Sequence, residues 1–205
     1  MNFSPPPTHP IPEFFSVETI DNFLPAEVHK RLHELLMPQP LPELQELDPV
    51  SSKSQQGNYV VKGDIPKRVP WFYIPNPSRI KGEDKNLFYL TNLVYDHTVI
   101  SPFYYNEIIP YLNQKLNIKS LIKMKINMYT FTETIREHGM HIDAPYSHKA
   151  AILSINTCDG YTKLEDGTKI DSIENRILLF DASRPHAGST TTNQSGRVNI
   201  NINYF

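Results

Sequence analysis

Residues 197–204, Arg-Val-Asn-Ile-Asn-Ile-Asn-Tyr, alternate strictly between polar and apolar side chains. Successive side chains of a β-strand point to opposite faces, so the stretch predicts a strand with one aliphatic face. Its other face carries Arg197 and three asparagines. A half-buried edge strand gives the same alternation, although Lys and Glu are more usual than Asn on a solvent face. The alternative is a polar pocket lined by hydrogen-bonding amides.

The segments before this strand predict helices early in the chain and antiparallel strands late. We expect helices over 25–37, 86–97 and 102–116, and short strands within 14–22, 58–61 and 71–74. After residue 120 we expect strands over 123–131, 149–156, 161–164, 168–173, 176–182 and 197–204, with a hairpin turn at 165–167. This order predicts an α+β, mainly β, domain whose N-terminal helices pack on one sheet.

Local signals suggest how the helices begin and bend. Asp21 or Asn22 can cap the first helix, and Pro25 suits its first turn. Pro110 lies inside the 102–116 pattern and predicts a kink or a restart of that helix.

Bulk composition narrows the class of protein. The net charge of −2 over 205 residues offers no electrostatic footprint for nucleic acid or a membrane surface. Cys158 is the single cysteine, which excludes an intrachain disulfide and suits a reducing compartment. Residues 1–12 are rich in Pro and lack the features of a signal peptide. We therefore expect a cytoplasmic protein that binds neither nucleic acid nor membranes.

The pair His141-x-Asp143 predicts a metal site. In an extended segment these residues point to the same face, so an imidazole and a carboxylate can converge on one ion. A second imidazole would complete the two-His-one-carboxylate set typical of non-haem Fe(II). We expect His186 to supply it and Arg197 to complete the site. A lone His-x-Asp pair is a weak signal, and a solvated loop is the alternative.

A second polar file runs along residues 123–131. Lys123, Lys125, Asn127, Tyr129 and Phe131 share one face of the expected strand. A solvated face is the alternative, most of all for the lysines. We expect the Tyr129 hydroxyl to enter a pocket, where it can hold a carboxylate oxygen.

In combination these residues resemble the 2-oxoglutarate- and Fe(II)-dependent oxygenases, in particular the prolyl-4-hydroxylase-like branch. The resemblance covers roughly residues 18–205 and rests on the order of several short motifs. Arg197 follows His186 by 11 residues, close to the family's interval. The other motifs are 20–25 (IDNFLP), 127–129 (NMY), the His141-x-Asp143 pair, 152–156 (ILSIN) and 175–180 (NRILLF).

The resemblance implies a fold, a set of ligands and a reaction. The fold is a double-stranded β-helix, or jelly roll. His141, Asp143 and His186 bind Fe(II), while Arg197 pairs with the distal carboxylate of 2-oxoglutarate with help from Tyr129. Asn199 replaces a hydroxyl residue common in relatives, and we expect Asn127 and Asn156 near the cosubstrate. The reaction uses O2, with ascorbate as a possible reductant, to hydroxylate an unactivated C–H bond while succinate and CO2 are released.

The resemblance also indicates which substrate and which domain organisation to expect. We expect a prolyl or other amino-acid side chain in a peptide or protein, with a free amino acid or other small molecule left open. The protein is expected to be a monomer or homodimer. We expect a Pro-rich tail over 1–17 and a single domain over 18–205, in which 18–119 supply helical support and 120–205 the jelly-roll core. Residues 48–85 are the expected lid.

Several residues remain open to two interpretations. We expect His138 to be a hydrogen-bonded loop residue rather than an alternative ligand, and His148 to lie at the surface or behind the site. We expect residues 71–73 (WFY) in the core more readily than on a substrate platform. Residues 159–163 replace a Gly-Gly-Glu-Thr run of relatives, which leaves the substrate open. A non-catalytic jelly roll that binds a metal, a ligand or a partner is the alternative to an enzyme.

Overall fold

The alternating C-terminal stretch forms β12 (Gly196–Tyr204), which lies inside a seven-stranded antiparallel sheet of order β1-β10-β7-β12-β6-β5-β4. The structure is a computed structural model that describes residues 16–37, 44–46, 59–61, 69–75 and 87–205. All nine residues of β12 are buried, with β7 (Lys149–Ser154) on one side and β6 (Leu121–Thr130) on the other. The edge-strand interpretation of this stretch is therefore wrong.

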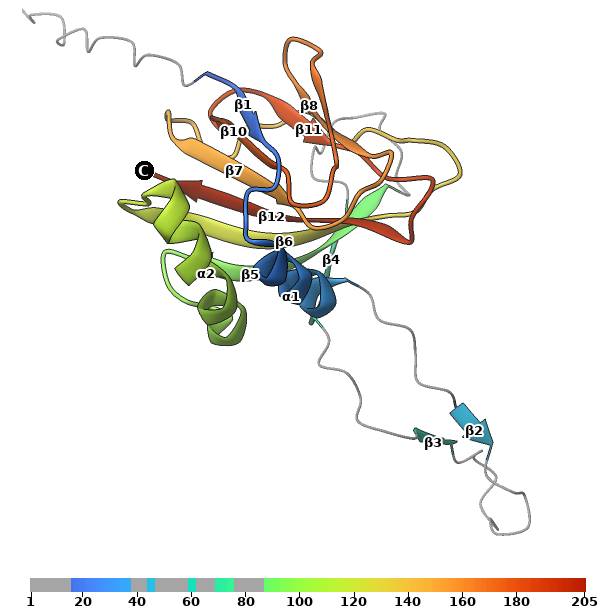
Figure 1. Cartoon of the computed structure of the whole chain (residues 1–205). Helices are drawn as coiled ribbons and strands as arrows, with labels where there is room; N and C mark the ends of the chain where they lie inside the picture. The colour runs from blue at the N-terminus through green and yellow to red at the C-terminus, as the bar shows by residue number, and fades with distance from the viewer. Residues whose placement is uncertain (1–15, 38–43, 47–58, 62–68, 76–86) are drawn as a thin grey trace, which may run out of the picture.

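A smaller sheet lies over the large one (Figure 1). It has the order β11-β8-β9, formed by β8 (Tyr161–Leu164), β9 (Lys169–Asp171) and β11 (His186–Gly188). Segment 137–141 joins its edge through two isolated bridges, from His141 to His186 of β11 and from Glu137 to Ser189, the residue after β11. From β6 onward the chain thus passes repeatedly between the two sheets. This topology confirms the predicted double-stranded β-helix.

Two helices cover the opposite face of the large sheet (Figure 1). They are α1 (Ala26–Leu36) and α2 (Pro102–Leu116), which confirms two of the three predicted helices. Their buried residues join the aliphatic face of β12 in one core, for example Leu32 and Ile108 with Ile200. Each fully buried side chain of this size contributes about 1.5–3 kcal/mol. At β12 and β6 the sheet therefore presents an apolar face to the helices and a polar face to the smaller sheet. At β7 and β10 the face toward the smaller sheet is apolar, because Ile152 and Phe180 share a second buried cluster with Leu164 of β8.

The predicted helix over 86–97 is wrong, because the segment forms strand β5 (Phe88–Asp96). Leu87, Leu90 and Val94 have helical spacing, but the segment pairs with β6 on one side and with β4 (Phe72–Pro75) on the other. Aromatic and branched side chains suit such a strand, and the tertiary pairing overrides the spacing. Of residues 71–73, Trp71 packs against the core as expected, whereas Phe72 and Tyr73 are exposed and contradict that expectation.

Helix ends differ from the local predictions. Pro25 itself is the N-cap of α1 and no side chain caps the helix, while Asp21 pairs instead with Arg176. Asn22 adopts a positive φ of 52° in the turn before the helix. α2 runs through Pro110 without a break.

The remaining elements are short. β1 (Glu18–Ile20) pairs with β10 (Ile177–Asp181) at the edge of the large sheet, and β2 (Leu44–Glu46) pairs with β3 (Tyr59–Val61). The Pro-rich stretch 1–12 and most of the expected lid, 48–85, lie outside the described residues. In the part of the chain that is described, neither helix has the length and apolar character to cross a membrane.

Candidate metal centre

His141, Asp143 and His186 converge on one point between the sheets. One ligand atom from each residue lies within 4.8 Å of the others. His186 Nε2 is 3.8 Å from Asp143 Oδ2, and His141 Nε2 is 4.0 Å from Asp143 Oδ1. The backbone holds this arrangement, because His141 and His186 exchange two N–H···O bonds of 2.9 Å and the Asp143 amide donates to Ala182 over 3.1 Å. The structure thus brings together the three residues predicted from the sequence.

Both imidazoles are oriented so that Nε2 is free to bind a metal. His141 Nδ1 lies 3.1 Å from the Gly139 carbonyl and His186 Nδ1 lies 3.0 Å from the Arg184 carbonyl. A carbonyl oxygen only accepts hydrogen bonds, so Nδ1 carries the proton in each ring and Nε2 keeps its lone pair. Among the described residues, His186 Nε2 and Asp143 Oδ2 are buried without a hydrogen-bond partner. Buried polar atoms of this kind require a partner, and a cation between them would supply it.

Electrostatics favour the protonation states that a metal requires. Burial lowers the pKa of His186, which keeps the ring neutral. Burial alone would raise the pKa of Asp143, but Lys125, His186, His141 and a hydrogen bond from Asn203 hold it below its usual value. Neutral imidazole and ionised carboxylate are the ligand forms of these residues.

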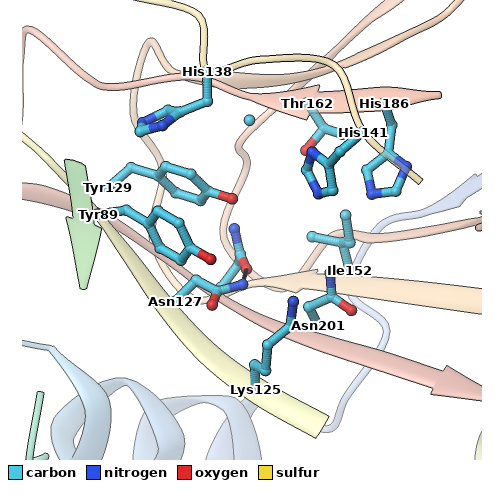
Figure 2. A pocket seen from close by; sticks show the side chains of 12 residues that line it. Tyr89, Lys125, Asn127, Tyr129, His138, His141, Ile152, Thr162, His186 and Asn201 are labelled. Atoms are coloured by element: carbon cyan, nitrogen blue, oxygen red, sulfur yellow. Dashed lines mark hydrogen bonds between the residues drawn. The ribbon is translucent and has the colours of Figure 1, made fainter. Parts of the chain in front are cut away.

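A cavity opens beside the three ligands, between the polar face of the large sheet and the small sheet (Figure 2). β5, β6, β7 and β12 supply one wall, while the small sheet and segment 137–141 supply the opposite wall. The lining residues are Tyr89, Lys125, Asn127, Tyr129, His138, His141, Ile152, Thr162, His186, Gly188, Asn199 and Asn201.

Arg197 lies behind this lining as a buried cation. It is 1% exposed, its Nη2 donates to Thr162 Oγ1 over 2.7 Å, and its guanidinium carbon lies 5.1 Å from the centre of the Tyr129 ring. Its Nε and Nη1 have no hydrogen-bond partner within the described part of the chain. Burying a charge without a counter-ion is costly, so these N–H groups indicate a place for an anion.

Tyr129 is packed as a neutral hydrogen-bonding group. Its ring stacks on Tyr89 at a centroid distance of 5.5 Å and meets the edge of His138 at 5.0 Å. Burial raises the pKa of Tyr129, so its hydroxyl stays protonated at neutral pH. A Cβ at Gly188 would lie 2.6 Å from the Tyr129 ring, so only glycine leaves the ring in this position.

The asparagines predicted near the cosubstrate separate into two groups. Asn127 and Asn199 line the cavity: Thr91 Oγ1 donates to Asn127 Oδ1 over 2.9 Å, and Asn127 Nδ2 donates to Asn199 Oδ1 over 3.4 Å. Asn156 does not reach the cavity. Its side chain accepts from the Val198 amide and donates to the Gly196 carbonyl, so it braces the backbone of β12.

The two other histidines behave differently from each other. His148 is buried behind the ligands, with Nε2 3.1 Å from Asn203 Oδ1, as the interpretation of a residue behind the site anticipates. His138 is buried too, but neither ring nitrogen has a hydrogen-bond partner among the described residues. The prediction that its side chain is hydrogen-bonded is therefore wrong. Burial lowers the pKa of His138 to about 4, with Arg197 and His141 adding to the effect.

Sequence reasoning missed several lining residues. Thr162 and Gly188 line the cavity, yet each comes from a short strand in which no local motif marks it. Asn201 also lines the cavity, in agreement with the interpretation of its strand as one wall of a polar pocket. Cys158 is buried.

Comparisons with known proteins give similar folds and no close relative. No protein-family model and no curated protein matches the sequence. Similar solved structures include a 2OG-Fe(II) oxygenase family oxidoreductase from Burkholderia pseudomallei, with 12% identity, a TM-score of 0.49, and coverage of 66% of this chain and 73% of that chain.

Two further similar structures are prolyl hydroxylases. One is a prolyl-4-hydroxylase from Pseudomonas putida, with 11% identity, a TM-score of 0.45, and coverage of 92% and 91%. The other is a prolyl hydroxylase from Trichoplax adhaerens in complex with a hypoxia inducible factor peptide fragment, with 17% identity, a TM-score of 0.46, and coverage of 92% and 83%. Likenesses this weak carry no argument about activity, which must rest on the site itself.

Proposed function

We propose that this chain is an Fe(II)- and 2-oxoglutarate-dependent dioxygenase that hydroxylates an unactivated C–H bond and releases succinate and CO2. One observation carries the proposal. Three metal-ligand atoms lie within 4.8 Å of one another in a cavity whose lining residues Thr162 and Tyr129 contact a buried guanidinium. Two nitrogens of that guanidinium have no partner among the described residues.

The donor set fits Fe(II). Two neutral imidazole nitrogens and one carboxylate form the set that binds non-haem Fe(II) while leaving other coordination positions open. His141, Asp143 and His186 would hold the ion, and the Gly139 and Arg184 carbonyls would keep the two rings in the required orientation.

The opposite end of the cavity fits one carboxylate of 2-oxoglutarate. Arg197 would bind it through the N–H groups of Nε and Nη1, because guanidinium stays charged at any working pH and binds carboxylates strongly. Thr162 holds the guanidinium in place, and the neutral Tyr129 hydroxyl would donate to the same carboxylate. Asn199 and Asn127 line the wall beside them.

In this proposal the bound groups supply the chemistry, and the chain binds and orients them. When bound, iron and 2-oxoglutarate supply the activation of O2 and the oxidising power for C–H hydroxylation. The residues described here bind and orient these groups, and the two sheets shield them from bulk water. For the substrate we propose a prolyl or other amino-acid side chain, which rests on the sequence resemblance.

The test is metal-dependent turnover of 2-oxoglutarate. The purified chain is incubated with Fe(II), 2-oxoglutarate, ascorbate and O2, and succinate is measured with and without candidate peptides and amino acids. Binding of 2-oxoglutarate is measured separately by calorimetry with Mn(II) in place of Fe(II), without O2. Metal binding without any 2-oxoglutarate binding would favour the non-catalytic jelly roll instead.

A further inference from the structure

We propose that Lys125 and Asn201 form a carboxylate-binding point at the metal end of the cavity, and that the substrate carries the carboxylate. This proposal rests on the proposed oxygenase function and narrows its substrate class. It requires a second anion site that is separate from Arg197, and the cavity wall formed by β6 and β12 supplies one.

Lys125 and Asn201 lie on adjacent strands of the large sheet. They face each other in the register of β6 and β12, four residues along β12 from Arg197. Both line the cavity, and Figure 2 shows the Lys125 ammonium beside the Asn201 amide, below His141 and His186. The side chain of Lys125 is 18% exposed, and its Nζ lies 3.9 Å from Asp143 Oδ1. Lys125 therefore places a cation beside the metal ligands.

The Lys125 ammonium makes no hydrogen bond to the described residues. Its distance to Asp143 is too long for a hydrogen bond, and within the described residues it has no other polar partner. A metal on Asp143 would draw the charge of that carboxylate away from the ammonium. Three N–H donors are then available to a ligand.

Asn201 adds a neutral donor beside the ammonium. Asn203 Nδ2 donates a hydrogen bond to Asn201 Oδ1 over 3.3 Å. The Asn201 oxygen is therefore engaged, and its Nδ2 has no partner among the described residues. Lys125 and Asn201 together present donors only, as a carboxylate requires.

Charge balance assigns the carboxylate to the substrate. A divalent metal and Arg197 bring three positive charges, and Asp143 with 2-oxoglutarate brings three negative charges. The site is therefore balanced before Lys125 is counted. Lys125 is the one charged residue among the described lining residues apart from the histidines, and a neutral prolyl ring offers it no partner. A substrate with a carboxylate near the reacting carbon would restore the balance.

The test uses acetate as the probe and acetamide as its neutral analogue. Each is titrated, without O2, into protein loaded with Mn(II) and 2-oxoglutarate, so that Arg197 is already occupied. Mn(II) is paramagnetic and shortens the relaxation time of methyl protons held near it, so the readout is independent of turnover. Acetate is expected to bind about tenfold more tightly than acetamide, the effect of one charge-assisted hydrogen bond.

Three variants make the test specific. Lys125→Met is expected to lose the preference for acetate over acetamide. Lys125→Arg keeps the charge and should retain part of the preference, which separates charge from folding. Lys123→Met is the matched control, because Lys123 lies two residues earlier on β6, pairs with Asp96 at 3.0 Å and does not line the cavity.

Each of the following outcomes would overturn the proposal. Acetate relaxation that persists in Lys125→Met indicates direct binding to the metal and overturns the proposal, as does equal binding of acetate and acetamide. A loss of 2-oxoglutarate affinity in Lys125→Met, with acetate unaffected, assigns Lys125 to the cosubstrate and overturns the substrate class. If wild-type protein with Mn(II) does not bind 2-oxoglutarate, the oxygenase function itself fails, which the calorimetry shows before acetate is added.

Discussion

Arg197 Nη2 donates a hydrogen bond to Thr162 Oγ1 over 2.7 Å, and this hydroxyl is the only hydrogen-bond partner of the guanidinium in the described part of the chain. The contact joins β12 of the large sheet to β8 of the small sheet. A neutral hydroxyl orients the cation without neutralising it, so the charge stays available for a ligand.

Replacing Arg197 with Ala is expected to weaken 2-oxoglutarate binding while leaving the metal in place. Loss of the charge-assisted hydrogen bonds should raise the Kd at least about tenfold. Calorimetry with Mn(II)-loaded protein measures it. Arg176→Ala is the matched control, because Arg176 pairs with Asp21 at the surface, outside the cavity. Equal affinity in Arg197→Ala and wild type would remove Arg197 from the cosubstrate site.

Replacing His141 with Ala is expected to abolish metal binding. The variant loses one of three ligands, while the backbone bonds between residues 141 and 186 persist. In wild type, a metal at about one hundred times its Kd should stabilise the fold by about 2.7 kcal/mol. Thermal unfolding with and without Mn(II) measures this, with the exposed His97→Ala as control. Retained stabilisation in His141→Ala would place the metal elsewhere.

Strand β12, which lines the candidate site, could be predicted from the sequence, whereas strand β5 could not, and the reason is physical. The alternation of β12 follows from one face packing on helices and the other facing a cavity, and both constraints are visible in eight residues. β5 has no such signature, because its neighbours β4 and β6 are distant in sequence. Leu87, Leu90 and Val94 have the spacing of a helix, and only the pairing with the neighbouring strands makes the segment a strand.

The cavity walls were harder to predict than the metal ligands. His141 and Asp143 are two residues apart, so local geometry brings them together. Thr162 reaches Arg197 only because the chain crosses between sheets, and its sequence neighbours give no hint of that contact. His138 was expected to find a hydrogen-bond partner, but the aromatic rings of Tyr89 and Tyr129 surround it.

His138 is expected to make the protein less stable in mild acid. Its pKa is about 4 in the folded protein and 6.5 when unperturbed, so between these values the unfolded chain binds more protons. The contribution of His138 to the free energy of unfolding is therefore complete above pH 6.5. It decreases as the pH approaches 4, by up to about 3 kcal/mol.

The measurement for His138 is urea unfolding at pH 7 and pH 5. His138→Phe keeps an aromatic ring against Tyr129 and should lose part of the pH dependence, while the buried His186 and His29, whose pKa values burial also lowers, retain theirs. The exposed His97→Gln is the control. An unchanged slope in His138→Phe would contradict the assignment of a buried neutral ring.

Replacing Gly188 with Ala is expected to impair 2-oxoglutarate binding through Tyr129. A Cβ at residue 188 would lie 2.6–2.8 Å from two ring carbons and the hydroxyl oxygen of Tyr129, so the ring must move away from Arg197 or the strand must shift. Overpacking of this kind costs about 1–3 kcal/mol. Calorimetry should show weaker 2-oxoglutarate binding with metal affinity retained, and thermal unfolding should show a lower Tm. Gly167→Asn is the control, because Gly167 lies in an open turn at a positive φ of 89°, which Asn tolerates. Wild-type affinity in Gly188→Ala would mean that the position of the Tyr129 ring does not govern cosubstrate binding.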